Sequence, residues 1–208
     1  MEINTIQGIP DLEKAKLLFE EAERINPGPW IGHCKYVAEG AKLIAANCKD
    51  LDSEVAYILG LLHDIGKING GTTISHIIDG YNYSMEMGYH FLAKICVTHS
   101  CPSKNILDII EVKESNTGEG HTFVENFLNT VDYDDYDKLI QLCDAIALPN
   151  GFTLIEKRLV DVALRHDVNK YTIPKWKAFL DLKKHFEEKM GKSIYSLLPG
   201  VIENTFEL

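Results

Sequence analysis

The sequence has few of the features that mark a secreted or membrane-spanning protein. Its five cysteines include no CxxC pair, so neither a disulfide framework nor a zinc ribbon is predicted. No apolar run approaches the roughly 20 residues that a transmembrane helix needs. The opening stretch MEINTIQGIPDLEK has neither the basic nor the apolar region of a secretion signal. We therefore expect a cytoplasmic protein with reduced cysteines and no membrane partner.

Positive charge is scarce as well. The 208-residue chain has 21 Lys and Arg against 31 Asp and Glu, which gives a formal net charge of −10 at pH 7. A surface with that charge repels a phosphate backbone, so we expect no nucleic-acid polymer as a partner. A small phosphorylated substrate is compatible with this charge, because it needs only a local cation. The sequence gives no indication of the oligomeric state.

The signatures of several common enzyme folds are also absent. The chain contains no GxxxxGK[ST], GxGxxG, HExxH or GxSxG motif, and no stretch alternates with period two long enough to predict a strand. Apolar residues recur at helical spacing instead, which predicts helices over 11–25, 30–47, 54–65, 75–87, 88–99, 105–112, 121–130, 135–148, 153–166 and 173–190. We predict an all-α protein: a single-domain helical bundle over 1–208, with a core at about 30–150 on which helices from 153–208 pack.

The adjacent pair His63 and Asp64 stands out because its surroundings are apolar, in the segment LGLLHDIGK. An ionisable pair near the end of an apolar helix has a desolvation cost unless another group compensates it. A metal cation compensates it well, because the charge of the carboxylate then forms a bond. The alternative is an exposed helix C-terminus with no function.

Two more positions place polar groups on apolar helical faces. His33 lies on the apolar face of its predicted helix, and Asp144 lies in LIQLCDAIAL with Ile140 one turn before it. An aspartate on such a face is rarely buried unless it is paired. A satisfied core histidine is the alternative for His33, and an ion pair with Arg158 is the alternative for Asp144.

Together, His33, His63, Asp64 and Asp144 offer two imidazoles and two carboxylates from three predicted helices. This mixed nitrogen and oxygen set suits a divalent ion such as Mn, Fe, Ni, Zn or Mg. A six-coordinate ion held by four protein groups keeps two positions for water and a substrate oxygen. We therefore predict that these four residues are metal ligands.

The order His33 … His63-Asp64 … Asp144, with the segment HDIGK, resembles the HD superfamily of metal-dependent phosphohydrolases. The four residues match that family's H…HD…D pattern, and the resemblance covers roughly residues 30 to 150. It implies an all-α fold of the HD-domain type and a phosphate monoester or diester as substrate, often a nucleotide. Some HD proteins have extra histidines before the last Asp, which bind a second metal or grip the substrate.

Three further residues are candidates around this site. Lys67 follows Gly66, which can end the helix and let the ammonium swing over the metal opening. There it would neutralise phosphate charge, unless it is simply a solvated lysine favoured by the helix dipole. His76 follows the glycine-bearing loop and His99 points inward, so either could grip substrate or bind a second ion. We assign catalytic roles to Asp64, Lys67 and His99, and substrate binding to Lys67, His76 and His99.

The prediction is a phosphohydrolase in which a divalent ion activates water for attack on a small phosphate ester, such as a nucleotide. Two alternatives stay open. Some HD-like folds hold a di-iron centre and act as oxygenases, which requires both His76 and His99 as ligands. The other alternative is a non-catalytic module that binds a nucleotide or a metal as a signal.

Other segments have simpler interpretations. The triplet Arg165-His166-Asp167 repeats the His-Asp pair but lacks the following Gly-Lys and the apolar setting, so it is interpreted as a helix end. The polar stretch 114–120 is a candidate cover for the pocket. Within the predicted helix 173–190, helical spacing assigns four apolar side chains to the core: Trp176, Phe179, Leu182 and Phe186.

Overall fold

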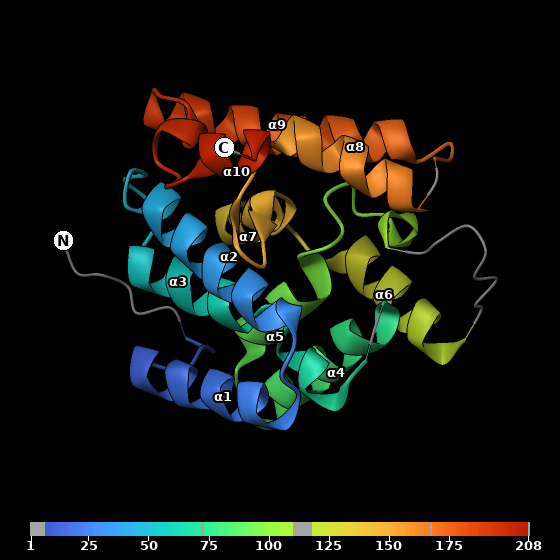
Figure 1. Cartoon of the computed structure of the whole chain (residues 1–208). Coiled ribbons are helices and arrows are strands. Elements are labelled where there is room, and N and C mark those ends of the chain that lie inside the picture. The colour runs from blue at the N-terminus through green and yellow to red at the C-terminus, as the bar shows by residue number, and fades with distance from the viewer. Residues whose placement is uncertain (1–6, 72, 110–117, 167, 208) are drawn as a thin grey trace.

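The computed structural model describes residues 7–71, 73–109, 118–166 and 168–207, and within these ranges the protein is all-α apart from one very short hairpin (Figure 1). This confirms the predicted fold class. The elements are α1 (Leu12–Ile25), α2 (Pro29–Ala45), α3 (Ser53–Leu62), η1 (Ile65–Asn69), α4 (Ile74–Glu86), α5 (His90–Thr98), η2 (Ile106–Asp108), α6 (Glu119–Thr130), α7 (Asp135–Ile146), β1 (Ala147–Leu148), β2 (Gly151–Phe152), α8 (Ile155–His166), α9 (Thr172–Met190), η3 (Ile194–Ser196) and α10 (Val201–Phe206). The η elements are short 3₁₀ helices.

Aspartate caps define where three of these helices begin. The Asp11 side chain accepts a hydrogen bond from the backbone N–H of Lys14, at the start of α1. Asp52 does the same at the start of α3, where it accepts from two backbone N–H groups. Asp134 and Asp137 form a reciprocal capping box at the start of α7. Each cap satisfies backbone donors that the helix itself leaves free, which typically contributes about 1 kcal/mol.

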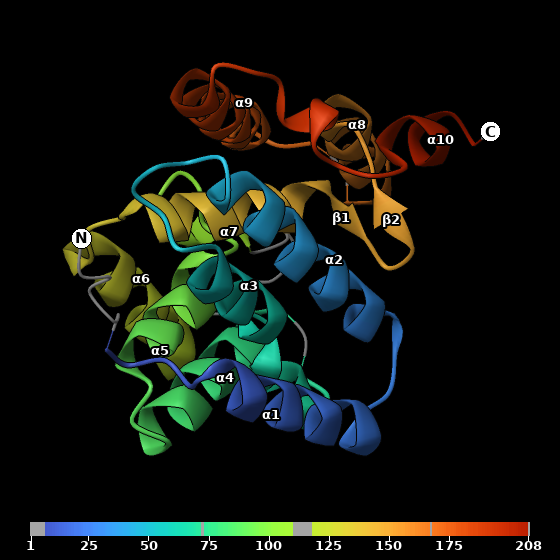
Figure 2. The ribbon, with the colours of Figure 1, turned by 90° about the vertical axis from the view of Figure 1, so that its left-hand side faces the viewer.

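The helices form three levels. Figure 2 shows α8, α9 and α10 on one side, α2, α3 and α7 in the middle, and α4, α5 and α1 on the opposite side. The principal core cluster runs through the middle level and is built largely of buried Leu, Ile and Ala side chains. A smaller cluster joins α4, α5 and α6. The middle level is therefore enclosed on both sides, and polar groups on it are shielded from water.

A close approach between α2 and α3 fixes the centre of the middle level. A Cβ atom added at Gly60 of α3 would lie 2.7 Å from the Cα atom of Ala38 on α2. Only glycine lets the two backbones pack at this distance. The contact holds His33 of α2 opposite His63, which follows α3 directly: their ring centroids are 5.5 Å apart.

Two predicted helices end earlier than expected. The helix predicted over 54–65 ends at Leu62, and Ile65–Asn69 forms a 3₁₀ turn where a glycine-bearing loop was predicted over 66–73. The helix predicted over 135–148 ends at Ile146, and the hairpin of β1 and β2 follows, although no strand was expected. Proline at 149 disfavours the helical conformation at the residue before it, which explains this second ending.

Parts of two predictions lie outside the described residues. Of the predicted helix 105–112, the structure shows the 3₁₀ turn Ile106–Asp108, and 110–112 is not described. The candidate cover at 114–120 is described only from Gly118 onward. Among the described residues, no helix is long and apolar enough to cross a bilayer. All five cysteines are buried and free.

Candidate metal centre

Six ionisable side chains from five parts of the fold meet at one point of the middle level. They are His33 on α2, His63 and Asp64 in the turn after α3, His76 on α4, His99 at the C-terminal end of α5, and Asp144 on α7. The turn after α3 holds the central pair, because Asp64 is within ion-pair distance of three of the other groups. The structure thus brings together every residue that was predicted to bind metal.

The first group of donors consists of the four residues of the predicted motif. The Nε2 atom of His33 lies 2.8 Å from Oδ1 of Asp144. The Nε2 atom of His63 lies 3.7 Å from that same oxygen and 3.6 Å from Oδ2 of Asp64. Ligand atoms of His33, His63 and Asp64 all lie within 4.8 Å of one another, which is close enough for them to share one ion.

The second group shares Asp64 with the first. The Oδ1 atom of Asp64 lies 3.2 Å from Nε2 of His76 and 3.5 Å from Nε2 of His99. These three residues form another set whose ligand atoms lie within 4.8 Å of one another, and all three are buried. The two groups together offer donors for two adjacent ions, with the carboxylate of Asp64 between them.

Backbone carbonyls orient three of the imidazole rings. The Nδ1 atom of His63 lies 2.8 Å from the carbonyl oxygen of Gly60, and that of His99 lies 3.0 Å from the carbonyl oxygen of Cys96. The Nδ1 atom of His33 lies 3.2 Å from a carbonyl oxygen of β1. A carbonyl can only accept, so Nδ1 carries the proton in each ring and Nε2 faces the centre. This arrangement is typical of metal-binding histidines.

Several of these atoms are buried without a hydrogen bond. Among the described residues, His63 Nε2, Asp64 Oδ1 and His76 Nδ1 are enclosed and have no hydrogen-bond partner. Unsatisfied polar atoms in a protein interior typically cost about 1–3 kcal/mol each. Two of the three, His63 Nε2 and Asp64 Oδ1, are ligand atoms that face the other donors. A divalent cation would satisfy both, so the residues present fit a metal.

The electrostatics of the centre keep its carboxylates ionised. Burial alone would raise the pKa of the Asp64 carboxyl, but His63, His76 and Lys67 hold it well below its ordinary value. Burial likewise opposes ionisation of Asp144, and the adjacent imidazoles of His33 and His63 lower its pKa well below the usual range. Both oxygen ligands are therefore negatively charged and ready to bind a cation.

The two buried histidines His63 and His99 differ in charge. Burial, followed by the nearby charge of His63, lowers the pKa of His99 to about 3. Burial also acts to lower the pKa of His63, but Asp64 raises it well above the ordinary value. In the metal-free protein His99 is thus neutral, and a proton on His63 partly compensates the carboxylates. A metal would compete with that proton, so its binding is expected to release protons.

Lys67 points back to the centre from η1. Its ammonium forms an ion pair with Oδ2 of Asp64, and its side chain is only partly exposed. The carbonyl of Lys67 accepts a hydrogen bond of 2.6 Å from the side chain of Asn26, which follows α1. Asn26 was not among the predicted residues, because the contact joins positions 41 residues apart. The ammonium of Lys67 thus lies beside the candidate metal ligands.

The structure differs from the alternative interpretations of Asp144 and His33. Arg158 does not pair with Asp144: its guanidinium lies 3.0 Å from the carboxylate of Asp161 on its own helix. His33 is partly exposed rather than enclosed in the core, and its Nε2 atom lies 2.8 Å from the Asp144 carboxylate of the centre. The helix α8 ends at His166, as expected for the second His-Asp pair, and residue 167 lies outside the described ranges.

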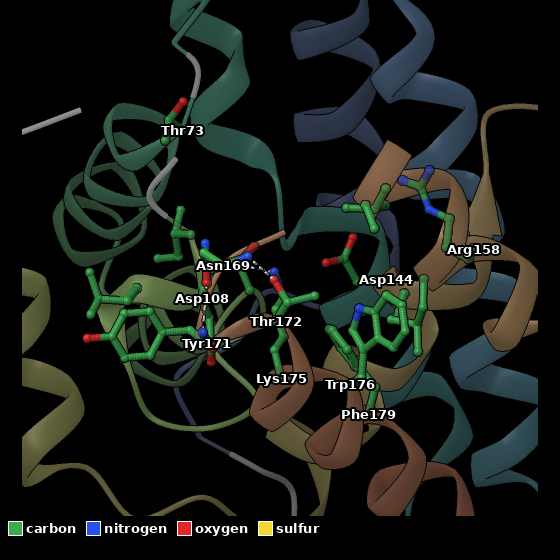
Figure 3. A pocket seen from close by; sticks show the side chains of 17 residues that line it. Thr73, Asp108, Asp144, Arg158, Asn169, Tyr171, Thr172, Lys175, Trp176 and Phe179 are labelled. Carbon is green, nitrogen blue, oxygen red and sulfur yellow. Dashed lines mark hydrogen bonds between the residues drawn. The ribbon is translucent and has the colours of Figure 1, made fainter. Parts of the chain in front are cut away.

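A cavity of about 360 Å³ adjoins the centre at Asp144 (Figure 3). The other five residues of the centre do not line it, so Asp144 is the point where cavity and centre meet. Its walls come mainly from α7, from α8, α9 and the loop that joins them, and from η2 with its neighbours Ser100 and Ile109. Helical spacing assigned Trp176 and Phe179 to the core. Phe179 is buried in the core and also lines this cavity, whereas Trp176 lines the cavity, is partly exposed and packs against the core.

Comparison with known proteins agrees with this geometry. The family model described as HD domain matches residues 30–148, which include all six residues of the centre and more than half of the chain. Comparisons with curated proteins and with solved structures give no match. The helices α8, α9 and α10 lie beyond the matched segment. The chain belongs to the HD domain family.

Proposed function

We propose that the protein is a metal-dependent phosphohydrolase that acts on a small phosphorylated substrate. The observation that carries the proposal is the convergence of four imidazoles and two carboxylates on one enclosed point, with buried ligand atoms that have no hydrogen-bond partner. Such a set has a high desolvation cost unless a cation binds it. The family, whose members include metal-dependent phosphohydrolases, supports the same activity.

The ligands divide into two groups. His33, His63, Asp64 and Asp144 would hold one divalent ion, and His76 and His99 would hold a second ion together with Asp64. When bound, such ions act as Lewis acids toward a phosphoryl oxygen and lower the pKa of bound water. The donor set contains nitrogen and oxygen only, which suits Mn, Fe, Ni, Zn or Mg.

The remaining chemistry belongs to the protein's own side chains. Lys67 would bind phosphoryl oxygens with its ammonium, which now pairs with Asp64 at the edge of the centre. His99 is neutral at pH 7, so its Nε2 atom has a free electron pair. With one ion bound, Asp64 or His99 would accept the proton of the attacking water. With two ions bound, His76 and His99 act as ligands and proton transfer falls to Asp64.

The test combines metal analysis with a phosphate-release assay. Purified protein should contain one or two divalent ions per chain and should release phosphate from a panel of small phosphate esters. His63→Ala and Asp144→Asn should each lose bound metal and activity. The exposed His90 on α5 provides a matched control, because His90→Ala removes an imidazole outside the centre. Full metal content and full activity in His63→Ala would overturn the proposal.

The second cluster favours one other activity. With a pair of iron ions held by His76, His99 and the first group of donors, the protein would be an oxygenase instead of a hydrolase. Iron at close to two ions per chain, together with substrate-dependent oxygen consumption and no phosphate release, would favour this activity. Phosphate release without oxygen consumption would exclude it.

A further inference from the structure

The cavity beside Asp144 is built mainly by helices that the family segment does not contain. Arg158 and Leu159 come from α8, and Lys175, Trp176 and Phe179 come from α9. Its volume of about 360 Å³ falls within the range of small-molecule sites. The helices outside the segment that matches the family model thus form a cavity directly next to Asp144, a candidate metal ligand.

Two anionic and two cationic side chains line the cavity. Its two carboxylates already have partners: Asp144 pairs with His33, and Asp108 accepts hydrogen bonds from the backbone and the hydroxyl of Ser103. Among the described residues, Arg158 contacts Asp161 through one nitrogen, and Lys175 donates to the backbone carbonyl of Asp108. In a protein with a net charge of −10, these two cations are the groups that could attract an anion into this cavity.

One wall of the cavity is aromatic. Figure 3 shows Arg158 and Trp176 on the same side as Asp144, and Asn169 and Thr172 on the other side. Trp176 is partly exposed to the cavity and packs on the core from its edge. An indole face next to a cation and a metal ligand is suited to a planar ring that carries an anionic group.

We propose that α8 and α9 select the substrate: Trp176 stacks on a planar ring carried by the phosphate ester, and Arg158 binds its anionic group. This assignment rests on the proposed function, because it places the scissile phosphate at the Asp144 end of the cavity. The ligand class is a phosphate ester with a planar aromatic ring, in contrast to an ester of an aliphatic alcohol. The ring would lie between Trp176 and the polar wall at Asn169 and Thr172.

The kinetic test compares matched substrates and matched variants. The four common nucleoside monophosphates and phenyl phosphate carry an aromatic ring and are the ring-bearing esters of this test. Ribose 5-phosphate, whose furanose is not aromatic, is the comparison, and it is ring-free in the sense that it lacks an aromatic ring. Trp176→Ala should lower kcat/KM for the preferred ring-bearing ester by about 5- to 100-fold, the range that loss of one stacking contact gives, and leave ribose 5-phosphate unchanged. Lys177→Ala, at an exposed neighbouring position that does not line the cavity, should change neither. An equal loss on both substrate types, or no loss on either, would overturn the role of Trp176.

The role of Arg158 has its own control. Arg158→Ala should raise KM for ring-bearing and ring-free esters alike by about tenfold, because both carry the phosphate. Arg165→Ala removes a guanidinium that contacts the same Asp161 but does not line the cavity, and it should leave KM unchanged. Equal effects of the two substitutions would show that Arg158 acts only through α8 and not through the ligand.

A binding measurement separates this proposal from the proposed function. The chain has two tryptophans, so Trp30→Phe leaves Trp176 as the single indole reporter. Titration of that variant with the ring-bearing phosphates should quench its fluorescence, and titration with ribose 5-phosphate should not. If no ester is hydrolysed but the ring-bearing phosphates quench the fluorescence of Trp176, the proposed hydrolase activity is wrong and the assignment of the pocket is supported. If esters are hydrolysed but no ring-bearing phosphate quenches Trp176 or binds more tightly than ribose 5-phosphate, the pocket assignment is wrong.

Discussion

Substitution of Gly66 by alanine should disturb the metal centre without changing any ligand. Gly66 lies in the HDIGK segment, in the buried part of η1. A Cβ atom added there would lie 2.0 Å from the carbonyl oxygen of His76 and 2.3 Å from the backbone nitrogen of Gly80. Both neighbours are backbone atoms of α4, so rotation of a side chain cannot relieve the contact.

The size of the effect follows from these distances. To reach even a close contact of 3.0 Å, η1 and α4 must separate by about 1 Å at His76. Overpacking of a core typically costs about 1–3 kcal/mol, and a contact with backbone belongs at the upper end. We therefore expect Gly66→Ala to lower the free energy of unfolding by about 3 kcal/mol. The same shift moves the Nε2 atom of His76 away from Asp64, which lies only 3.2 Å from it.

Two measurements check the reasoning. Urea unfolding of the metal-free protein gives the loss of stability, and metal analysis of the folded fraction gives the loss of the second ion. Gly118→Ala is the matched control, because no atom of the described residues lies within 4 Å of a Cβ atom at Gly118 and its φ of −76° suits alanine. The reasoning is refuted if Gly66→Ala stays within about 0.5 kcal/mol of the parent protein and keeps its full metal content.

Four further predictions concern the metal and the surface charges. Saturating divalent metal, at 100 times its Kd, should raise the free energy of unfolding by about 2.7 kcal/mol, and a chelator should reverse the gain; a metal-independent unfolding curve would contradict this. Asp144→Asn should weaken metal binding at least tenfold by calorimetry, since it removes a charged ligand; unchanged affinity would exclude Asp144 as a ligand. His99→Ala should reduce bound metal from two ions to one per chain, and His90→Ala should keep two. Burial opposes ionisation of Asp135, but Lys189 and Lys138 lower its pKa to about 2, so its stabilisation is present above about pH 4 and is lost as the pH falls toward 2. Asp135→Asn should therefore cost about 1–2 kcal/mol in urea unfolding at pH 7 and only a small part of that near pH 2, and an equal cost at both pH values would contradict the assignment.

Much of the fold was predictable because its signals are local. Aspartate caps and apolar stripes of period 3.6 depend on residues only a few positions apart, and α1, α7 and α9 begin within one residue of the prediction. The candidate ligands His33, His63, Asp64 and Asp144 were predictable for a related reason. Ionisable groups on apolar faces have a desolvation cost that the sequence alone reveals.

The hairpin after α7 was not predicted, and it contributes to the centre. Apolar periodicity continues through Ala147 and Leu148, so the pattern extended the helix past Ile146. The Pro-Asn-Gly sequence that follows was the available signal for a turn. Ending the helix there lets the carbonyl of Ala147 face Nδ1 of His33 at 3.2 Å. Such a contact between positions 114 residues apart depends on tertiary packing and leaves no trace in local sequence.

The cavity was missed because helical spacing shows which side chains share a face but not what that face meets. Thr172, Lys175, Trp176 and Phe179 lie on one stripe of α9, and all four line the cavity. Further along the same helix, Phe179, Leu182 and Phe186 are buried in the core. The signal that distinguishes the two ends is polarity: a hydroxyl and an ammonium interrupt the stripe only in its first turn. A core face seldom includes a lysine, so Lys175 on the inward stripe indicates a cavity where the apolar pattern alone indicates packing. The same reasoning applies to Arg158, which shares the cavity wall with Leu159 on α8. If Trp176 were only a core residue, Trp176→Ala would lower stability and leave the ratio of kcat/KM between ring-bearing and ring-free esters unchanged.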